Sequence, residues 1–380
     1  TVSGANYLSA GLSWLFSWGQ WGIWYLGQGL HCPQWLTGFL ADGVYLCVSS
    51  VVAVMLPPMA IFFPCFALLE DSGYLPRAAF NLDRIFKKVG TNGQQALTMS
   101  VGFGCNAAGV LACRIIENPR ERLIAMLTNC FVPCNGRFPL LIALAGVGVL
   151  MGGSSSSWLV ALIVLGVVLL GMGISLLVSR LLSLTILKGE ASAFVLELPS
   201  YRKPQWGKVI VRALKDRLYF VLRRAVLVSI PAGAVIWLLA NIQWQGLSYL
   251  THLANFLDPA ARLLGLDGYI LTAFLLALPA NEIVLPILLM GYLASSSLGE
   301  IANWQSLYQL LAVEQHWSIT TIICTILFSL LHFPCSTTLL TIRKESGSAW
   351  WMLAGFLIPT AVAALTCFLV CQTAHYLGLN

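Results

Sequence analysis

Apolar runs nearly free of charge constrain this chain more than any other feature of its sequence. The clearest covers residues 158–187, and another covers residues 349–372. About 20 apolar residues in a helix cross a hydrocarbon core about 30 Å thick. Of the 380 residues, 58% are hydrophobic and 9% are charged, against about 25% charged in a typical soluble domain. The sequence therefore predicts an all-α, polytopic transmembrane helical bundle.

Several of these runs are interrupted by proline or glycine. Pro57, Pro58 and Pro64 are expected to break the span 43–69, and Pro231 is expected to kink a later one, because proline removes a backbone hydrogen bond and clashes with the preceding turn. Two glycine- or proline-broken segments, 96–113 and 269–292, are interpreted as re-entrant hairpins that enter and leave on one membrane face. Residues 242–268 are predicted to be a loop, and residues 293–317 are polar and lack Lys and Arg.

The distribution of basic residues supports the re-entrant interpretation. With two hairpins, 18 of the 21 Lys and Arg residues fall on one side, which the positive-inside rule assigns to the cytosol. If both segments were short full spans instead, basic loops would lie on both faces. The predicted cytosolic segments are 70–95, 114–122, 188–224 and the charged turn 343–348.

The chain then divides into four parts. Residues 1–42, rich in Trp and without Lys or Arg, are predicted to be an external amphipathic interfacial segment. Residues 43–187 form a first transmembrane half. Residues 188–224 form a cytosolic basic amphipathic linker, and residues 225–380 form a second transmembrane half. The first residue is Thr1 rather than Met, which predicts a fragment or a processed product, and no secretory signal pattern is present.

The two halves repeat an order of features. In each half a proline-containing span precedes a broken hairpin, which reads GFGCN at 102–106 and LPANE at 278–282. In each, a span with a central break follows, which reads FVPCNGRFP at 131–139 and HFPCS at 332–336. Paired broken segments at matching positions of two halves indicate a transporter binding site, because unpaired backbone at membrane depth must face protein or a water-filled cavity.

Side chains at these breaks could bind a cation. Thiol groups with amide and carboxylate oxygens suit a borderline divalent ion such as Fe²⁺ better than Mg²⁺ or Ca²⁺. The predicted ion-pathway residues are Cys105, Asn106, Cys134, Asn135, Cys335 and Glu282. Cysteines such as Cys47 are interpreted as packing residues, and so are Met55 and Met59.

Four further residues, Glu70, Asp71, His332 and Arg137, are secondary candidates. Glu282 is an ionisable residue at membrane depth, which makes it a candidate cation or proton site, with pairing to Arg137 as the structural alternative. Glu70 and Asp71 could collect a departing cation, or pair with Arg77 or cap the next helix, the interpretation that we favour. His332, beside the second Pro-Cys break, is a candidate ligand or proton relay.

The same motifs closely resemble a known family. LLEDSGYLPRAAFNLDRIF (68–86), GFGCNAAGVLACRIIENPRER (102–122), PCNGRFPLLIAL (133–144) and FPCSTTLLTIRKE (333–345) resemble the membrane domain of bacterial ferrous iron transport protein B, FeoB. The resemblance covers the chain from about residue 30 to residue 372. It departs at Asn281-Glu282, where many members have Lys-Glu. Loss of that positive charge would leave the Glu282 carboxylate freer to meet a cation, or would change how the gate is locked.

This resemblance implies Fe²⁺ import across the bacterial cytoplasmic (inner) membrane by two pseudo-repeated gate domains, 43–187 and 225–380. It implies that Cys105, Cys134 and Cys335 line the iron path. GTP and Mg²⁺ would act only through an upstream cytosolic GTP-binding domain absent from this chain. The expected partners are Fe²⁺, the lipid bilayer, that domain, a small cytosolic accessory protein and further copies of the chain, with no nucleic acid.

Two rivals remain beside this interpretation. A gate-domain carrier for nucleosides or another solute would need aromatic and hydrogen-bonding groups rather than converging thiols. A membrane thiol oxidoreductase would use Cys130 with Cys134, or Cys367 with Cys371, but neither pair has C-x-x-C spacing. No phosphate-binding loop, H-E-x-x-H or G-x-S-x-G motif occurs, so the chain itself is predicted to be a transporter without catalytic residues.

Overall fold

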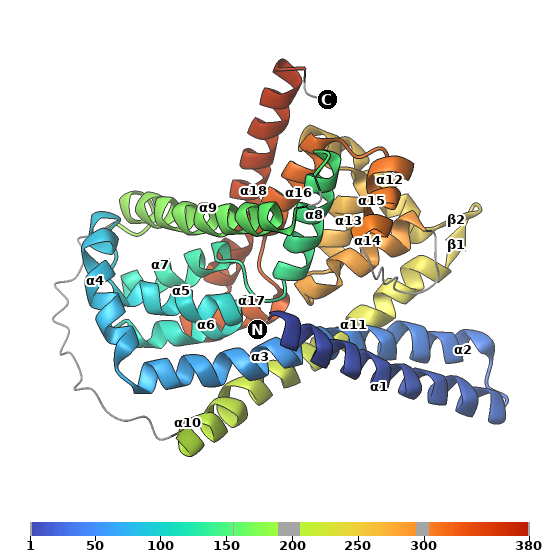
Figure 1. Cartoon of the computed structure of the whole chain (residues 1–380), viewed down its shortest axis with the longest axis horizontal. Coiled ribbons are helices and arrows are strands. Elements are labelled where there is room, and N and C mark those ends of the chain that lie inside the picture. Colours follow the sequence, from blue (N-terminus) through green and yellow to red (C-terminus); the bar gives the residue numbers. More distant parts are fainter. Residues whose placement is uncertain (1, 155, 189–205, 294–303, 379–380) are drawn as a thin grey trace.

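The computed structural model describes residues 2–154, 156–188, 206–293 and 304–378. These residues are almost entirely helical, and one two-residue β-hairpin is the exception (Figure 1). The predicted all-α membrane fold is confirmed. In the described ranges, five helical runs are long and apolar enough to span a membrane, and six if a bent pair counts as one. The five are Gln34–Asp71, Ser157–Leu184, Val221–Asn241, Ile319–Ser346 and Ala349–Tyr376.

The first 71 residues form a long helical hairpin. Helix α1 (Val2–Gly29) packs back against η1 (Phe39–Tyr45) and α3 (Leu46–Asp71), and α2 (Gln34–Gly38) begins the second arm. The helical run thus begins at Gln34, before the apolar run expected at 43–69. The interfacial placement of residues 1–42 stays a prediction.

The predicted break at the three prolines of this span is wrong. Helix α3 runs without interruption through Pro57, Pro58 and Pro64. Helix α11 (Tyr219–Asn241) likewise contains Pro231 within its length. Membrane helices tolerate proline because neighbouring helices and local backbone adjustments compensate for the freed backbone groups, and α3 is packed by α1, α11 and η4 (Ala213–Leu218).

The first half continues with short helices. Gly73 has φ 78°, a left-handed conformation that favours glycine, and turns the chain from α3 into α4 (Tyr74–Lys88). The first hairpin consists of α5 (Gln94–Gly104) and α6 (Asn106–Ala112), which pack against each other. The elements that follow are η2 (Cys113–Ile115), α7 (Pro119–Thr128), η3 (Asn129–Phe131), α8 (Phe138–Met151) and α9 (Ser157–Leu184).

The second half begins with one helical run made of α10 (Trp206–Arg212), η4 and α11. The predicted linker 188–224 therefore continues directly into the next span, and its residues 189–205 lie outside the described residues. The loop predicted at 242–268 is wrong in part, because it contains β1 (Gln243–Trp244), β2 (Leu247–Ser248) and α12 (Tyr249–Leu263). Serine and aspartate side chains cap α12 and α13 (Gly268–Leu276), as expected at helix starts.

The second hairpin joins α13 through η5 (Asn281–Ile283) to α14 (Val284–Tyr292). The polar stretch 293–317 contains α15 (Trp304–Tyr308) and η6 (Gln309–Glu314). The second broken span is α16 (Ile319–Leu331) and α17 (Ser336–Ser346), followed by α18 (Ala349–Tyr376). Helix α17 includes Arg343 and Lys344, so the charged turn predicted at 343–348 is mostly helix.

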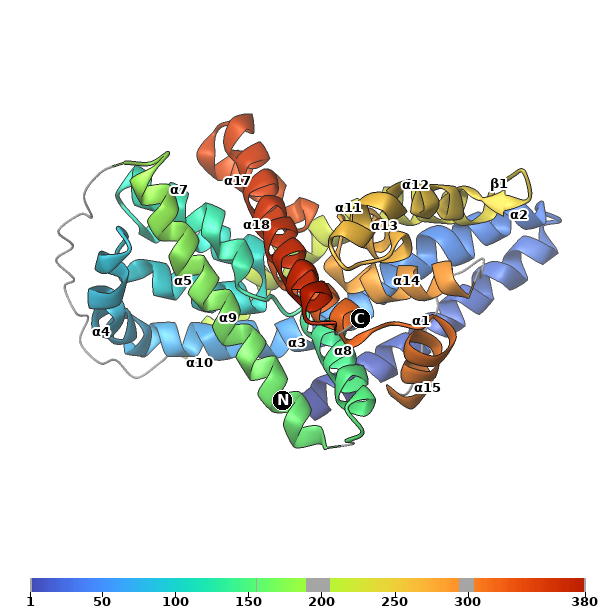
Figure 2. The ribbon, with the colours of Figure 1, turned by 90° about the horizontal axis from the view of Figure 1, so that it is seen from above.

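The two hairpins approach the middle of the molecule from opposite sides, α5 and α6 from one and α13 and α14 from the other (Figure 1). Seen at right angles, α18 crosses the centre, where it packs on α16 and α17 (Figure 2). The hairpin tips share a backbone feature. Cys105 (φ −158°, ψ 126°) and Ala280 (φ −153°, ψ 120°) are both extended, and each directly precedes an asparagine. The repeat read from the sequence thus has a counterpart in backbone geometry.

Candidate functional site

The first hairpin turns at Cys105, where the helical hydrogen-bond pattern stops and restarts. The Cys105 N–H still bonds back to the Val101 carbonyl at 3.2 Å, and the Cys105 carbonyl accepts from Gly109 N–H at 2.9 Å. Gly104 packs so tightly on the Phe62 ring that a Cβ would overlap it. The thiol of Cys105, 8% exposed, is held at this turn.

Buried asparagines fix the same turn to the first broken span. Asn129, fully buried, donates from Nδ2 to the Asn106 carbonyl at 3.2 Å and lies between Gly102 and Gly109. With its amide nitrogen turned toward Gly102 and Val132, Asn106 donates to their carbonyls at 3.3 and 3.2 Å. The Asn106 nitrogen therefore serves the backbone, which leaves its oxygen as the group available to an ion.

The first Pro-Cys break lies between η3 and α8 and is closed by Arg137. Arg137 N–H donates to the Cys134 carbonyl at 2.9 Å. The Arg137 side chain, 1% exposed, donates to four carbonyls of the two breaks, those of Cys130 (2.8 Å), Leu330 (2.6 Å), His332 (3.0 Å) and Phe333 (3.3 Å). Arg137 thus binds the exposed carbonyls at the ends of two interrupted helices, one from each half.

The second hairpin contacts both breaks. The Leu278 carbonyl accepts from Ser336 N–H at 2.7 Å, which ties the hairpin tip to the start of α17. The carboxylate of Glu282 packs against Gly136, where a Cβ would lie 2.6 Å from Cδ of the glutamate. At the start of α17, Cys335 Sγ lies 3.3 Å from Thr338 Oγ1.

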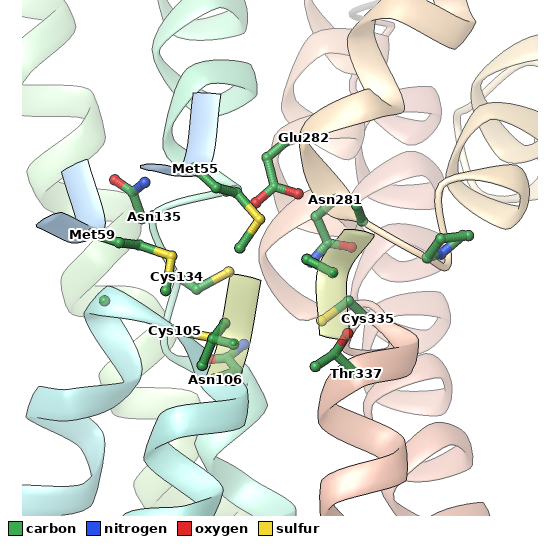
Figure 3. Close-up of a pocket in the computed structure, with 16 residues that line it drawn as sticks. Met55, Met59, Cys105, Asn106, Cys134, Asn135, Asn281, Glu282, Cys335 and Thr337 are labelled. Atoms are coloured by element: carbon green, nitrogen blue, oxygen red, sulfur yellow. The ribbon is translucent and has the colours of Figure 1, made fainter. Parts of the chain in front are cut away.

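All six predicted pathway residues line one cavity of about 30 Å³ (Figure 3). Its walls come from both hairpin tips, both Pro-Cys breaks, α3 and α11. The lining includes Met55, Met59, Gly104, Cys105, Asn106, Cys134, Asn135, Gly136, Pro279, Ala280, Asn281, Glu282, Cys335 and Thr337. The volume is room for one or two water-sized particles and lies far below the roughly 300–1,000 Å³ of pockets for small organic ligands.

The secondary candidates lie elsewhere. Glu70 and Asp71 end α3 at the corner with α4 and do not line the cavity. His332 is buried among the rings of Phe274, Phe328 and Phe333 and is likewise absent from the lining. Its Nδ1 is 2.9 Å from the carbonyls of both Phe328 and Ser329.

The structural alternative considered for Glu282, a pair with Arg137, is wrong. Lys87–Asp83, Arg114–Glu345 and Arg262–Asp258 are ion pairs within 4.0 Å, and no such pair joins Glu282 to Arg137 in the described chain. Arg137 uses its guanidinium on backbone carbonyls instead. The Glu282 carboxylate therefore faces the cavity without a basic partner in the described chain.

The donors do not form a compact metal-binding cluster. In the part of the chain that the structure describes, no group of three or more His, Cys, Asp or Glu side chains could hold a metal ion. The cavity therefore offers sulfur and oxygen donors from several sides rather than a preformed cage.

Sequence reasoning did not identify three residues that line the cavity, namely Met55, Met59 and Gly136. Met55 and Met59, interpreted as packing residues, line the cavity one helical turn apart on α3. Gly136 has no side chain, and the Glu282 side chain occupies the space that a Cβ there would fill. The available signals were the i, i+4 spacing of the methionines and the glycine between Asn135 and Arg137.

Comparisons with known proteins give two family-model matches. A family model described as nucleoside recognition, the Gate model, matches residues 52–148 and 222–349, one segment in each half. A second model, described as ferrous iron transport protein B C terminus, matches residues 164–216. No solved structure matches the chain.

Curated relatives carry names that agree with the second model. An Fe(2+) transporter FeoB of Staphylococcus aureus is 30% identical over 90% of this chain and 49% of its own length. One of Salmonella typhimurium is 34% identical over 55% of this chain and 26% of its own length. A Porphyromonas gingivalis protein named as a fusion of Fe(2+) transport protein A with FeoB is 28% identical over 87% of this chain and 44% of its own length. The chain thus spans about half the length of the first of these relatives.

Proposed function

The chain belongs to the Fe(2+) transporter FeoB family, and on that premise we propose that it moves Fe²⁺ across the bacterial cytoplasmic membrane through the cavity at the helix breaks. The observation that carries this proposal is the convergence of the donors. Three thiols, one carboxylate and three amide groups from both halves line a space large enough for an ion alone. Such a mixture of sulfur and oxygen donors suits a borderline dication.

The amide, carboxylate and thiol groups that line the cavity have different roles in the passage of a dication. As the ion sheds water, amide oxygens of Asn106, Asn135 and Asn281 replace part of its hydration shell. Glu282 supplies negative charge at membrane depth, where a bare dication is strongly disfavoured. The thiols of Cys105, Cys134 and Cys335 bind the ion as thiolates, so occupancy releases protons.

The main rival is a nucleoside carrier, which the description of the Gate model raises. A nucleoside needs a pocket of several hundred Å³ with polar groups for base and ribose. A cavity of about 30 Å³ lined by thiols and thioethers favours an ion over a nucleoside. Proteoliposomes separate the two. We expect uptake of ⁵⁵Fe²⁺ under reducing conditions and none of ³H-uridine or ³H-adenosine, and the reverse result would favour the rival.

The thiols are tested by replacing Cys105, Cys134 and Cys335 together with Ser in the protein expressed in an iron-starved bacterial strain without other ferrous importers. We expect ⁵⁵Fe²⁺ accumulation to fall at least about 10- to 100-fold, since loss of even the outer-shell partners of metal ligands has costs of this size. A matched control replaces Cys32, Cys65 and Cys371, which do not line the cavity. Normal accumulation in the first triple variant, at equal membrane abundance, would contradict the proposed path.

Coupling to GTP belongs to the same proposal. The family resemblance implies a GTP-binding domain ahead of the membrane part, and helix α10 with the basic segment 188–224 would face it on the cytosolic side. The fused relative suggests a small accessory protein as a further partner. If deletion of such an upstream domain left whole-cell Fe²⁺ uptake unchanged, coupling would be excluded.

A further inference from the structure

Two methionines bring thioether sulfur into the proposed ion cavity. Met55 and Met59 lie one turn apart on α3, and Met59 is 1% exposed. In Figure 3 their side chains point into the same cavity as the thiols of Cys105, Cys134 and Cys335. Five sulfur atoms thus line a space that holds one carboxylate, that of Glu282.

The five sulfur atoms of this donor set also suit ions softer than Fe²⁺. Thiolate and thioether ligands select Cu(I), whereas Fe²⁺ binds well to nitrogen and oxygen donors. A thioether is neutral and needs no deprotonation, so it binds a monovalent ion without a proton leaving. Cu(I) and Ag(I) are also stable with only two or three ligands. They therefore do not need the compact cluster of His, Cys, Asp and Glu that is lacking among the described residues.

We propose that the cavity binds a soft monovalent cation, Cu(I) or Ag(I), through the thioethers of Met55 and Met59 together with a cavity thiol, and that this ion blocks Fe²⁺ passage. The binding depends only on the donors that line the cavity. The block rests in addition on the proposed function.

The difference between passage and block lies in residence time. Fe²⁺ binds the mixed oxygen and sulfur donors weakly enough to move on, which conduction requires. A soft ion gains from each sulfur and leaves slowly. Since the cavity has room for about one ion, an ion that stays excludes the next.

Copper K-edge absorption spectroscopy tests the ligation directly. The purified full-length protein is labelled with selenomethionine and given one equivalent of Cu(I) without oxygen. Selenium scatters more strongly than sulfur, so a Cu–Se neighbour reports a thioether ligand even among the 11 cysteines of the chain. We expect Cu–Se scattering in the wild type and its loss in Met55→Leu/Met59→Leu, a replacement that nearly conserves volume.

The control variant is Met126→Leu/Met151→Leu, which removes two methionines that do not line the cavity. It should keep the Cu–Se signal. A wild-type spectrum with sulfur neighbours only would overturn the inference, because the thioethers would then be packing groups.

The block is tested with Ag⁺, which does not undergo redox cycling. In proteoliposomes, the Ag⁺ concentration that halves ⁵⁵Fe²⁺ uptake should rise at least about tenfold in Met55→Leu/Met59→Leu, measured against the uninhibited rate of that variant, since tenfold corresponds to about 1.4 kcal/mol of binding. Equal inhibition of both proteins would overturn the block. If the wild type moved no Fe²⁺ while its copper kept selenium neighbours, the proposed transport would fail and the binding inference would stand.

Discussion

At Gly136 the backbone approaches the Glu282 carboxylate so closely that no side chain fits between them. The glycine comes from the first half of the chain and the glutamate from the second. Glu282 is the only carboxylate that lines the cavity among the described residues. Its position therefore depends on the absence of a Cβ at Gly136, in the other half of the chain.

Replacing Gly136 with Ala should displace Glu282 and lower ⁵⁵Fe²⁺ uptake about 10- to 100-fold, since a misplacement of about 1 Å in a functional group has costs of this size. The measurement is uptake per membrane-inserted protein in iron-starved cells. Gly166→Ala is the control, because a Cβ there meets nothing within 4 Å. Equal uptake by both variants would mean that the exact place of Glu282 does not matter.

At the residue scale, the sequence was sufficient to identify cavity-lining residues whose side chains are unusual at membrane depth. Thiols, amides and a carboxylate beside glycine or proline breaks stand out against an apolar background, and all six chosen positions line one cavity. Met55 and Met59 could not be found this way, because methionine in an apolar helix looks like any core residue. The partners of Arg137 were also hidden, since backbone carbonyls leave no trace in a sequence.

At the scale of elements, Arg137 joins two interrupted helices through their carbonyls. The last carbonyls of a helix carry partial negative charge, which favours a cation there. A buried guanidinium can therefore be stabilised without a carboxylate, and it holds both breaks in one arrangement.

Arg137→Met should destabilise the protein by at least about 3 kcal/mol, because each hydrogen bond from a charged group contributes about 1.5–3 kcal/mol. Arg137→Lys should lose less, since it keeps the charge. Thermal unfolding in detergent is the measurement. Arg262→Met removes an exposed pair with Asp258 and should cost less than about 0.5 kcal/mol. If Arg137→Met and Arg262→Met unfolded at the same temperature, Arg137 would not hold the breaks.

Hydrogen bonds join the two helices of the second hairpin at the end opposite the tip that lines the cavity. Tyr292, at the end of α14, donates to Asp267 at the start of α13 and accepts from Trp317 Nε1 at 3.1 Å. Tyr292→Phe should therefore destabilise the protein by about 1–3 kcal/mol, because a half-buried carboxylate loses its donor. Tyr376→Phe, at a side chain 93% exposed, serves as the control in the same unfolding assay. An unchanged midpoint for Tyr292→Phe would show that these hydrogen bonds are unimportant.

Element boundaries were the least predictable part of the fold. Pro57, Pro58 and Pro64 read as a break but lie within a continuous helix, because packing of α3 on its neighbours overrides local preference. The actual breaks carry Gly-Cys-Asn, Pro-Ala-Asn or Pro-Cys. Tertiary contacts of these segments, rather than proline alone, decide where a membrane helix stops.

At the scale of the whole molecule, the two halves meet in a second place besides the cavity. Arg114 of η2 and Glu345 of α17 form a two-pronged pair, with Nε–Oε2 at 2.6 Å and Nη2–Oε1 at 2.7 Å. Both residues lie in segments predicted to be cytosolic. The arginine side chain is 58% exposed and the glutamate side chain 7% exposed, so one partner of the pair is open to solvent.

Fixing this contact should stop transport if the halves must move apart to pass an ion. We expect a short bis-methanethiosulfonate reagent, which joins the two cysteines through disulfide bonds, to abolish ⁵⁵Fe²⁺ uptake in Arg114→Cys/Glu345→Cys, and a reducing agent to restore it. The control pair is Asp83→Cys/Lys87→Cys, which bridges one turn of α4. Undiminished uptake by the cross-linked Arg114/Glu345 variant would mean that ions pass while the halves stay together.

The helical run Gln34–Asp71 has 38 residues and so rises about 57 Å, nearly twice the hydrocarbon thickness of about 30 Å. If Glu70 and Asp71 lie at the inner headgroups, the surplus stands beyond the outer leaflet as a rod braced by α1. An arriving solute would then meet the tryptophan-rich end of this helical hairpin before it reaches the lipid surface. Shortening α2 and η1 together with the facing turns of α1 would bring that first encounter down to the bilayer.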